Sequence, residues 1–174
     1  MERSKTKLLI LRMNISGPLM ENGTKSVKLS KRYCQILVNV SMLNILYRRS
    51  GCINPGELKC KEIRGTEFVT LKAGRDPEDP VLKYLMFVLK GIKNAIAKGF
   101  LREIHLVLKH PQTLVPLEIY TIAVKYNTTG VIKDDLPNLR DSTLMVLKHI
   151  RNLDKFTQLP RYTKVKVELT YNES

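Results

Sequence analysis

The sequence predicts an α+β domain in which three helices pack on one face of an antiparallel sheet. Helical and strand patterns follow one another in the order helix, helix, two strands, helix, strand, which is typical of this class. Hydrophobic residues make up 43% of the 174 residues, enough for one full core. No internal repeat or low-complexity segment interrupts these patterns. We expect residues 24–174 to form the domain and residues 1–23 an N-terminal arm.

The first part of the chain combines a short apolar run with Gly, Pro and Asn, so residues 1–23 are expected to be strand-like or loose. A long helix follows, capped by Thr24 or Ser26 and ending near Arg49. Its apolar residues cover more than one stripe, which is typical of a buried central helix. The basic residues Arg48 and Arg49 at its end suit the helix dipole.

Residues 52–80 show a looser pattern, with short strands around Ile63 and over residues 68–71 before a Gly- and Pro-rich break. A second helix is predicted over residues 78–98, because apolar residues recur there at three- and four-residue spacing. Gly99 is expected to end it.

A hairpin of two strands is predicted over residues 100–109 and 116–126, where apolar residues alternate. The second strand places Glu118 and Tyr120 on the same face as the apolar residue Ile122.

A third helix is predicted over residues 136–156, with Asp141 or Ser142 as its N-cap. The last element is a strand over residues 161–171. Apolar and polar residues alternate along it, which indicates one buried face and one solvent-exposed face.

The chain is strongly basic, since 30 Lys and Arg face 16 Asp and Glu and leave a net charge of +14. This excess favours acidic partners such as nucleic acid, chromatin or an acidic protein. A solvated helix face is the other interpretation, because aromatic residues are only 6% of the chain and none is interleaved with the charges. The candidate nucleic-acid contacts at the start of the first helix are Lys25, Lys28, Lys31 and Arg32.

The sequence contains no phosphate-binding loop and no nucleophile elbow. Its three His and three Cys lack the spacing of metal ligands, and its acidic pairs lie where caps explain them. We therefore predict a non-enzymatic protein without metal or cofactor. No apolar run approaches the roughly 18 residues of a membrane span, so no membrane partner is expected.

Several segments resemble a HORMA domain. They are SMLNILYRR at residues 41–49, GIKNAIAKGFLREI at residues 91–104 and EIYTIAVKY at residues 118–126. The run KGFL at residues 98–101 is most similar to the meiotic chromosome axis members of the family. The resemblance covers residues 24–171.

The resemblance implies an adaptor that captures peptides. In HORMA domains a mobile C-terminal segment, the safety belt, wraps over a short closure motif that adds a strand to the sheet. In the meiotic branch these motifs lie in axis partners or in the protein's own tail, and an AAA+ ATPase opens the domain. The resemblance thus implies a nuclear, chromosomal protein of the synaptonemal complex that acts in pairing, synapsis and DNA recombination.

Carried onto this chain, the strand over residues 161–171 is the docking edge. The residues expected at that edge are Tyr162, Lys164, Lys166 and Glu168. In the family the safety belt follows this strand, whereas the sequence stops at Ser174, so we expect either a truncated chain or a protein without a belt. The alternative function is a basic DNA- or chromatin-binding domain without peptide capture.

Overall fold

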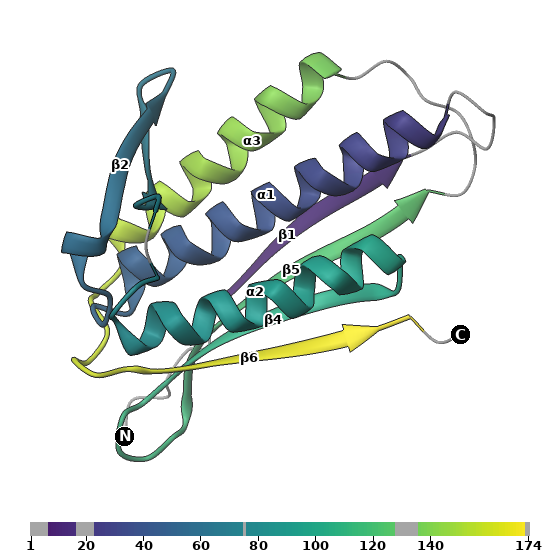
Figure 1. Cartoon of the computed structure of the whole chain (residues 1–174). Helices are drawn as coiled ribbons and strands as arrows, with labels where there is room; N and C mark the ends of the chain where they lie inside the picture. Colours follow the sequence, from purple (N-terminus) through teal and green to yellow (C-terminus); the bar gives the residue numbers. More distant parts are fainter. Residues whose placement is uncertain (1–6, 17–22, 75, 128–135, 173–174) are drawn as a thin grey trace.

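A computed structural model shows three helices on one face of a four-stranded sheet, with a two-stranded hairpin beside them (Figure 1). It describes residues 7–16, 23–74, 76–127 and 136–172. The helices are α1 (Gly23–Arg49), α2 (Pro80–Lys98) and α3 (Leu136–Arg151), with the 3-10 turns η1 (Pro55–Glu57) and η2 (Asn152–Lys155). The strands are β1 (Lys7–Ser16), β2 (Leu58–Ile63), β3 (Thr66–Leu71), β4 (Leu101–Lys109), β5 (Pro116–Asn127) and β6 (Lys164–Tyr171). The predicted α+β class is confirmed.

The four strands of the large sheet lie in the order β1-β5-β4-β6. The hairpin of β4 and β5 is antiparallel, as predicted, and β6 is antiparallel to β4. β1 differs, because it runs parallel to β5, from Lys7 opposite Glu118 to Ser16 opposite Asn127. The sheet is therefore mixed, and Figure 1 shows β1 in purple and β6 in yellow at its two edges.

α1 is the buried central helix that its sequence predicts. Among the side chains of α1 that the structure describes, from residue 31 onward, the apolar ones with at most 6% exposure are Cys34, Leu37, Val38, Met42, Leu43, Ile45 and Leu46. The polar residue Asn44 is also buried, and its amide bonds to the Val40 carbonyl of its own helix and to the backbone of Val69 on β3. Its Oδ1 accepts the Val69 N–H at 2.7 Å and its Nδ2 donates to the Val69 carbonyl at 2.9 Å. Asn44, a polar residue within the apolar run of α1, thus bonds this helix to the hairpin of β2 and β3.

α2 begins and ends at local signals. Asp79 caps its start by accepting the N–H groups of Val81 at 2.7 Å and Leu82 at 3.1 Å. Gly99 ends it in the left-handed region at φ +84°, which favours glycine. The buried stripe between them consists of Leu82, Leu85, Ile92, Ala95 and Ile96.

The predicted cap of the third helix is wrong. α3 begins at Leu136, so Asp141 and Ser142 lie inside the helix, where the backbone is already hydrogen-bonded. Asp141 instead pairs with Arg64 of the β2–β3 turn at 3.2 Å. The helix also ends at Arg151 and continues as η2, short of the predicted residue 156.

Replacing Asp79 should destabilise the fold, because its carboxylate serves both α2 and the η1 region. Oδ2 accepts the Asn54 N–H at 2.8 Å in addition to the two helix contacts of Oδ1. We expect Asp79→Ala to lower the free energy of unfolding by about 1–2 kcal/mol, measured by urea denaturation. Asp79→Asn keeps an acceptor and should lose clearly less; equal losses would contradict the capping role.

Candidate functional site

The outer side of β6 is the open edge of the large sheet. β6 is the last strand in the sheet order, and no strand in the described part of the chain pairs with that side. Its inner side is paired with β4, with Glu168 opposite His105 and Lys166 opposite Val107. An unpaired edge presents a row of free N–H and C=O groups to any chain that approaches it.

One hydrogen bond identifies which groups of β6 point outward. The Val167 N–H donates to the hydroxyl of Tyr84 on α2 at 3.1 Å, so it takes no part in the ladder with β4. In an antiparallel strand the backbone N–H and C=O groups of every second residue point to the same neighbouring strand, and those of the residues between them point to the opposite side. The backbone groups of Val165, Val167 and Leu169 therefore face the open edge, whereas those of Lys166 and Glu168 bond to β4.

The side chains of β6 alternate as the sequence predicts. Val165, Val167 and Leu169 are half-buried and pack against the core, while Lys164, Lys166 and Glu168 are exposed. These three exposed residues are among the four predicted peptide contacts. The fourth, Tyr162, precedes the strand in a turn, at φ +64° and 78% exposure.

Lys166 and Glu168 form an ion pair on the exposed face of β6, with 2.6 Å between Nζ and Oε1. Their hydrogen bond lowers the pKa of Glu168 and raises the pKa of Lys166 relative to their ordinary values. Both side chains are therefore ionised at neutral pH, and this face of the edge carries both signs of charge.

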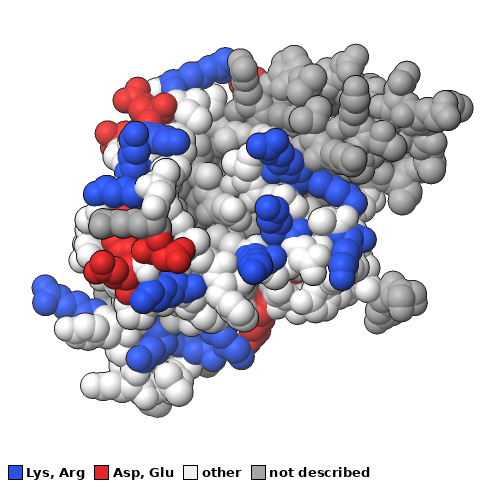
Figure 2. Space-filling model, viewed as in Figure 1, with Lys and Arg blue, Asp and Glu red and all other residues white. Residues whose placement is uncertain are grey.

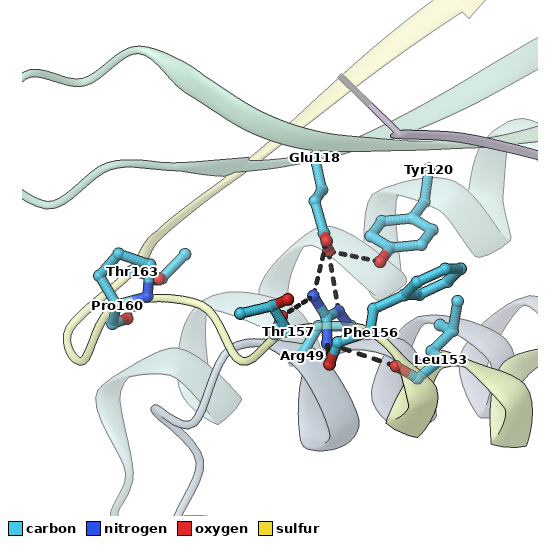
Figure 3. A network of polar contacts seen from close by, with 8 residues as sticks. All are labelled: Arg49, Glu118, Tyr120, Leu153, Phe156, Thr157, Pro160 and Thr163. Carbon is cyan, nitrogen blue, oxygen red and sulfur yellow. Dashed lines mark hydrogen bonds and ion pairs between the residues drawn. The ribbon is translucent and has the colours of Figure 1, made fainter. Parts of the chain in front are cut away.

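The position of β6 depends on a buried ion pair between α1 and β5 (Figure 3). Arg49 and Glu118 are only 3% and 2% exposed. The guanidinium binds the carboxylate through two bonds, Nη2 to Oε1 at 2.6 Å and Nε to Oε2 at 2.9 Å. The Tyr120 hydroxyl donates to the same carboxylate at 2.6 Å. Such complete satisfaction is what makes a buried charge pair tolerable.

Arg49 also holds the segment that leads from η2 to β6. It donates to the carbonyls of Leu153 and Phe156 at 3.3 Å each and of Thr157 at 2.8 Å. Its guanidinium lies 5.8 Å from the centre of the Phe156 ring. The hydrogen bond to Glu118 raises the pKa of Arg49, and burial raises the pKa of Tyr120. One charged side chain thus connects α1, β5 and the segment that leads to β6.

Sequence reasoning assigned Arg49 to the helix dipole and missed this network. The signal was nevertheless present, because the alternation of β5 places Glu118 on an apolar face with Ile122. A carboxylate on a buried face needs a cation or hydrogen-bond donors to compensate for its loss of water. The identity of that partner depends on how α1 packs against β5, which no local pattern reveals.

A second polar cluster lies on the other face of the sheet. His105 Nδ1 is 3.0 Å from the hydroxyl of its cross-strand neighbour Thr121, and Nε2 is 3.3 Å from Glu103. Thr121 is buried, so this arrangement is best understood as cross-strand stabilisation. In the ranges that the structure describes, no group of three His, Cys, Asp or Glu could hold a metal ion. The described helices also include none that is long and apolar enough to cross a membrane.

The predicted nucleic-acid contacts are only partly described. The side chains of Lys25 and Lys28 lie outside the described residues. Lys31 donates from Nζ to the Ala97 carbonyl near the end of α2 at 2.7 Å, and Arg32 is exposed. Figure 2 shows Lys and Arg side chains gathered over the region of α1 and α2.

The family model of the HORMA domain matches residues 30–174. The chain belongs to the HORMA family. Among curated proteins, none matches this sequence. The expected family and its fold of helices on a sheet are therefore confirmed.

Solved structures of HORMA proteins share this fold. C. elegans HTP-2 bound to the HIM-3 closure motif is similar with a TM-score of 0.68 and 16% identity, covering 91% of this chain and 72% of that one. C. elegans HTP-1 bound to the same motif has a TM-score of 0.62 and 15% identity, covering 82% of this chain and 70% of that one. A chain of the mitotic checkpoint complex has a TM-score of 0.65 and 14% identity, covering 83% of this chain and 76% of that one.

Arg49→Lys should strongly destabilise the protein. An ammonium group cannot make the bidentate contact to Glu118 and also donate to the three backbone carbonyls that Arg49 binds. We expect a loss of about 3 kcal/mol or more in the free energy of unfolding, measured by urea denaturation.

The neighbouring residue provides a matched control. Arg48 pairs with Asp154, whose side chain is about half exposed, so Arg48→Lys should lose less than about 1 kcal/mol. Similar losses for the two variants would contradict the central role of Arg49.

Proposed function

We propose that this HORMA protein is a non-enzymatic adaptor of the meiotic chromosome axis that captures short closure-motif peptides by strand addition. The observation that supports this function best is the open edge of β6, where the backbone groups of Val165, Val167 and Leu169 point away from β4. An extended peptide would pair there as a further strand, with main-chain hydrogen bonds supplying affinity. The closure motifs bound to HTP-1 and HTP-2 support the same function.

The predicted contact residues fit this proposal. Lys164, Lys166 and Glu168 would flank the added strand on the exposed face of β6, and Tyr162 would lie at its beginning. The charged pair of Lys166 and Glu168 could exchange partners with charged side chains of the peptide.

The biological setting is part of the proposal. The likeness of residues 98–101 to the meiotic members supports action on chromosomes in the nucleus, in pairing, synapsis and recombination control. It likewise supports closure-motif peptides of axis proteins as partners and an AAA+ ATPase as the factor that opens the domain.

Blocking the edge should prevent peptide capture. Leu169→Pro removes an N–H that points outward, and Pro is tolerated on edge strands. We expect peptides selected from a random phage-displayed library on the whole chain to lose about tenfold or more in affinity for this variant.

Leu169→Ala is the matched control, because it removes the same half-buried side chain and keeps the N–H. Its affinity for the selected peptides should stay within about threefold of the original. Thermal unfolding of both variants shows how much of any change comes from stability. A library that yields no peptide sensitive to Leu169→Pro would refute peptide capture at β6.

DNA or chromatin binding is the second candidate function, favoured by how α1 and α2 meet. Gln35 of α1 donates to the Lys93 carbonyl at 3.0 Å, and Lys31 reaches the Ala97 carbonyl. These contacts bring the start of α1 beside the exposed Lys93 and Lys98 of α2. A shared basic surface of this kind would attract phosphate groups.

The combined substitutions Lys93→Ala and Lys98→Ala should weaken binding to short duplex DNA, measured by fluorescence anisotropy over a range of salt. The slope of log K against log salt should become shallower by about one for each phosphate that the protein no longer neutralises. Lys59→Ala with Lys61→Ala, exposed on β2, is the control and should change little. Equal effects of the two pairs would argue against this surface.

A further inference from the structure

The side chain of Tyr84 on α2 occupies the edge at which the proposed peptide would bind. Its hydroxyl lies 3.1 Å from the N–H of Val167, although the two residues are 83 positions apart in the chain. This N–H is one of the outward donors of β6, and its hydroxyl partner comes from a helix that belongs to the other layer of the fold. The contact therefore bridges the helix layer and the open sheet edge.

An added strand would need the same donor. In an antiparallel or parallel ladder the outward N–H groups of the edge strand donate to the carbonyls of the incoming chain. An N–H makes one good hydrogen bond, so the Tyr84 hydroxyl and a peptide carbonyl compete for Val167. The hydroxyl must leave before the ladder can run through the centre of β6.

The contact also has a role while the edge is empty. The Val167 side chain packs against the core, while its N–H lies on the outer side of the strand and donates to the Tyr84 hydroxyl. The hydroxyl satisfies this donor and shields the middle of an edge that would otherwise be open to unspecific pairing. Tyr84 is itself 38% exposed, so its ring can swing toward solvent without opening the core.

We propose that Tyr84 is a specificity-determining residue of the peptide site, whose hydroxyl takes the place of a peptide carbonyl at Val167 and is displaced on binding. This inference rests on the proposed function of β6. A peptide must offset the loss of the hydroxyl's hydrogen bond with its own binding free energy. Peptides that pair weakly are therefore rejected, and peptides that make several further contacts are retained.

Tyr84→Phe tests this, because it keeps the ring and removes only the competing hydroxyl. Peptides are selected from a random phage-displayed library on both the original chain and this variant. Peptides that are sensitive to Leu169→Pro should bind Tyr84→Phe about two- to tenfold more tightly, the value of one hydrogen bond. Tyr47→Phe on α1, where Tyr47 has the same 38% exposure, is the matched control and should leave affinity unchanged.

A second measurement requires no peptide. Amide hydrogen exchange of Val167 in the free chain should become about two- to tenfold faster in Tyr84→Phe and stay unchanged in Tyr47→Phe. Equal or weaker peptide affinity for Tyr84→Phe, or an unchanged Val167 exchange rate, would overturn the role of Tyr84 alone. If neither chain selects any peptide sensitive to Leu169→Pro, the proposed function of β6 fails instead.

Discussion

The buried ion pair of Arg49 and Glu118 is the contact on which the arrangement of this protein depends. Removing two charges from water is costly unless every donor and acceptor is satisfied. Arg49 meets this condition only when Glu118 and the carbonyls of the segment after η2 are all in place. The pair therefore favours one packing of α1, β5 and the chain entering β6 over others with a similar apolar core.

α1 organises the fold through its polar residues as much as through its apolar ones. Asn44 binds the backbone of β3, and Arg48 pairs with Asp154 in η2. The apolar residues of α1 drive burial but specify partners only loosely, because hydrophobic contact is non-directional. Directional bonds from Asn44, Arg48 and Arg49 select which segments meet the helix. The orientation of β6, and with it the open edge, follows from those selections.

Local signals explain what could be predicted from the sequence. The limits of α2 follow from Asp79 and Gly99, and the hairpin follows from the alternation on either side of the turn. The parallel pairing of β1 with β5 could not be predicted, since it joins segments more than 100 residues apart and leaves no local pattern. The N-cap of α3 was misassigned for a related reason, although the predicted start at residue 136 is correct. Asp141 resembles a cap in sequence but pairs with Arg64 of a distant turn.

The candidate site also has features that the sequence predicts and features that it does not. Alternation predicted that Lys164, Lys166 and Glu168 share the exposed face of β6. It could not predict which backbone groups are unpaired, because that depends on which residues bond to β4. The contact of Tyr84 with Val167 was equally hidden, since it depends on the packing of α2 beside the last strand.

Residue-by-residue amide hydrogen exchange of β6, before and after addition of a selected peptide, tests the central claim most directly. The open edge predicts that Val165, Val167 and Leu169 gain protection, while Lys166 and Glu168 stay as protected as β4 already makes them. Protection that arises on β1 or β2, with those three amides unchanged, would contradict the account.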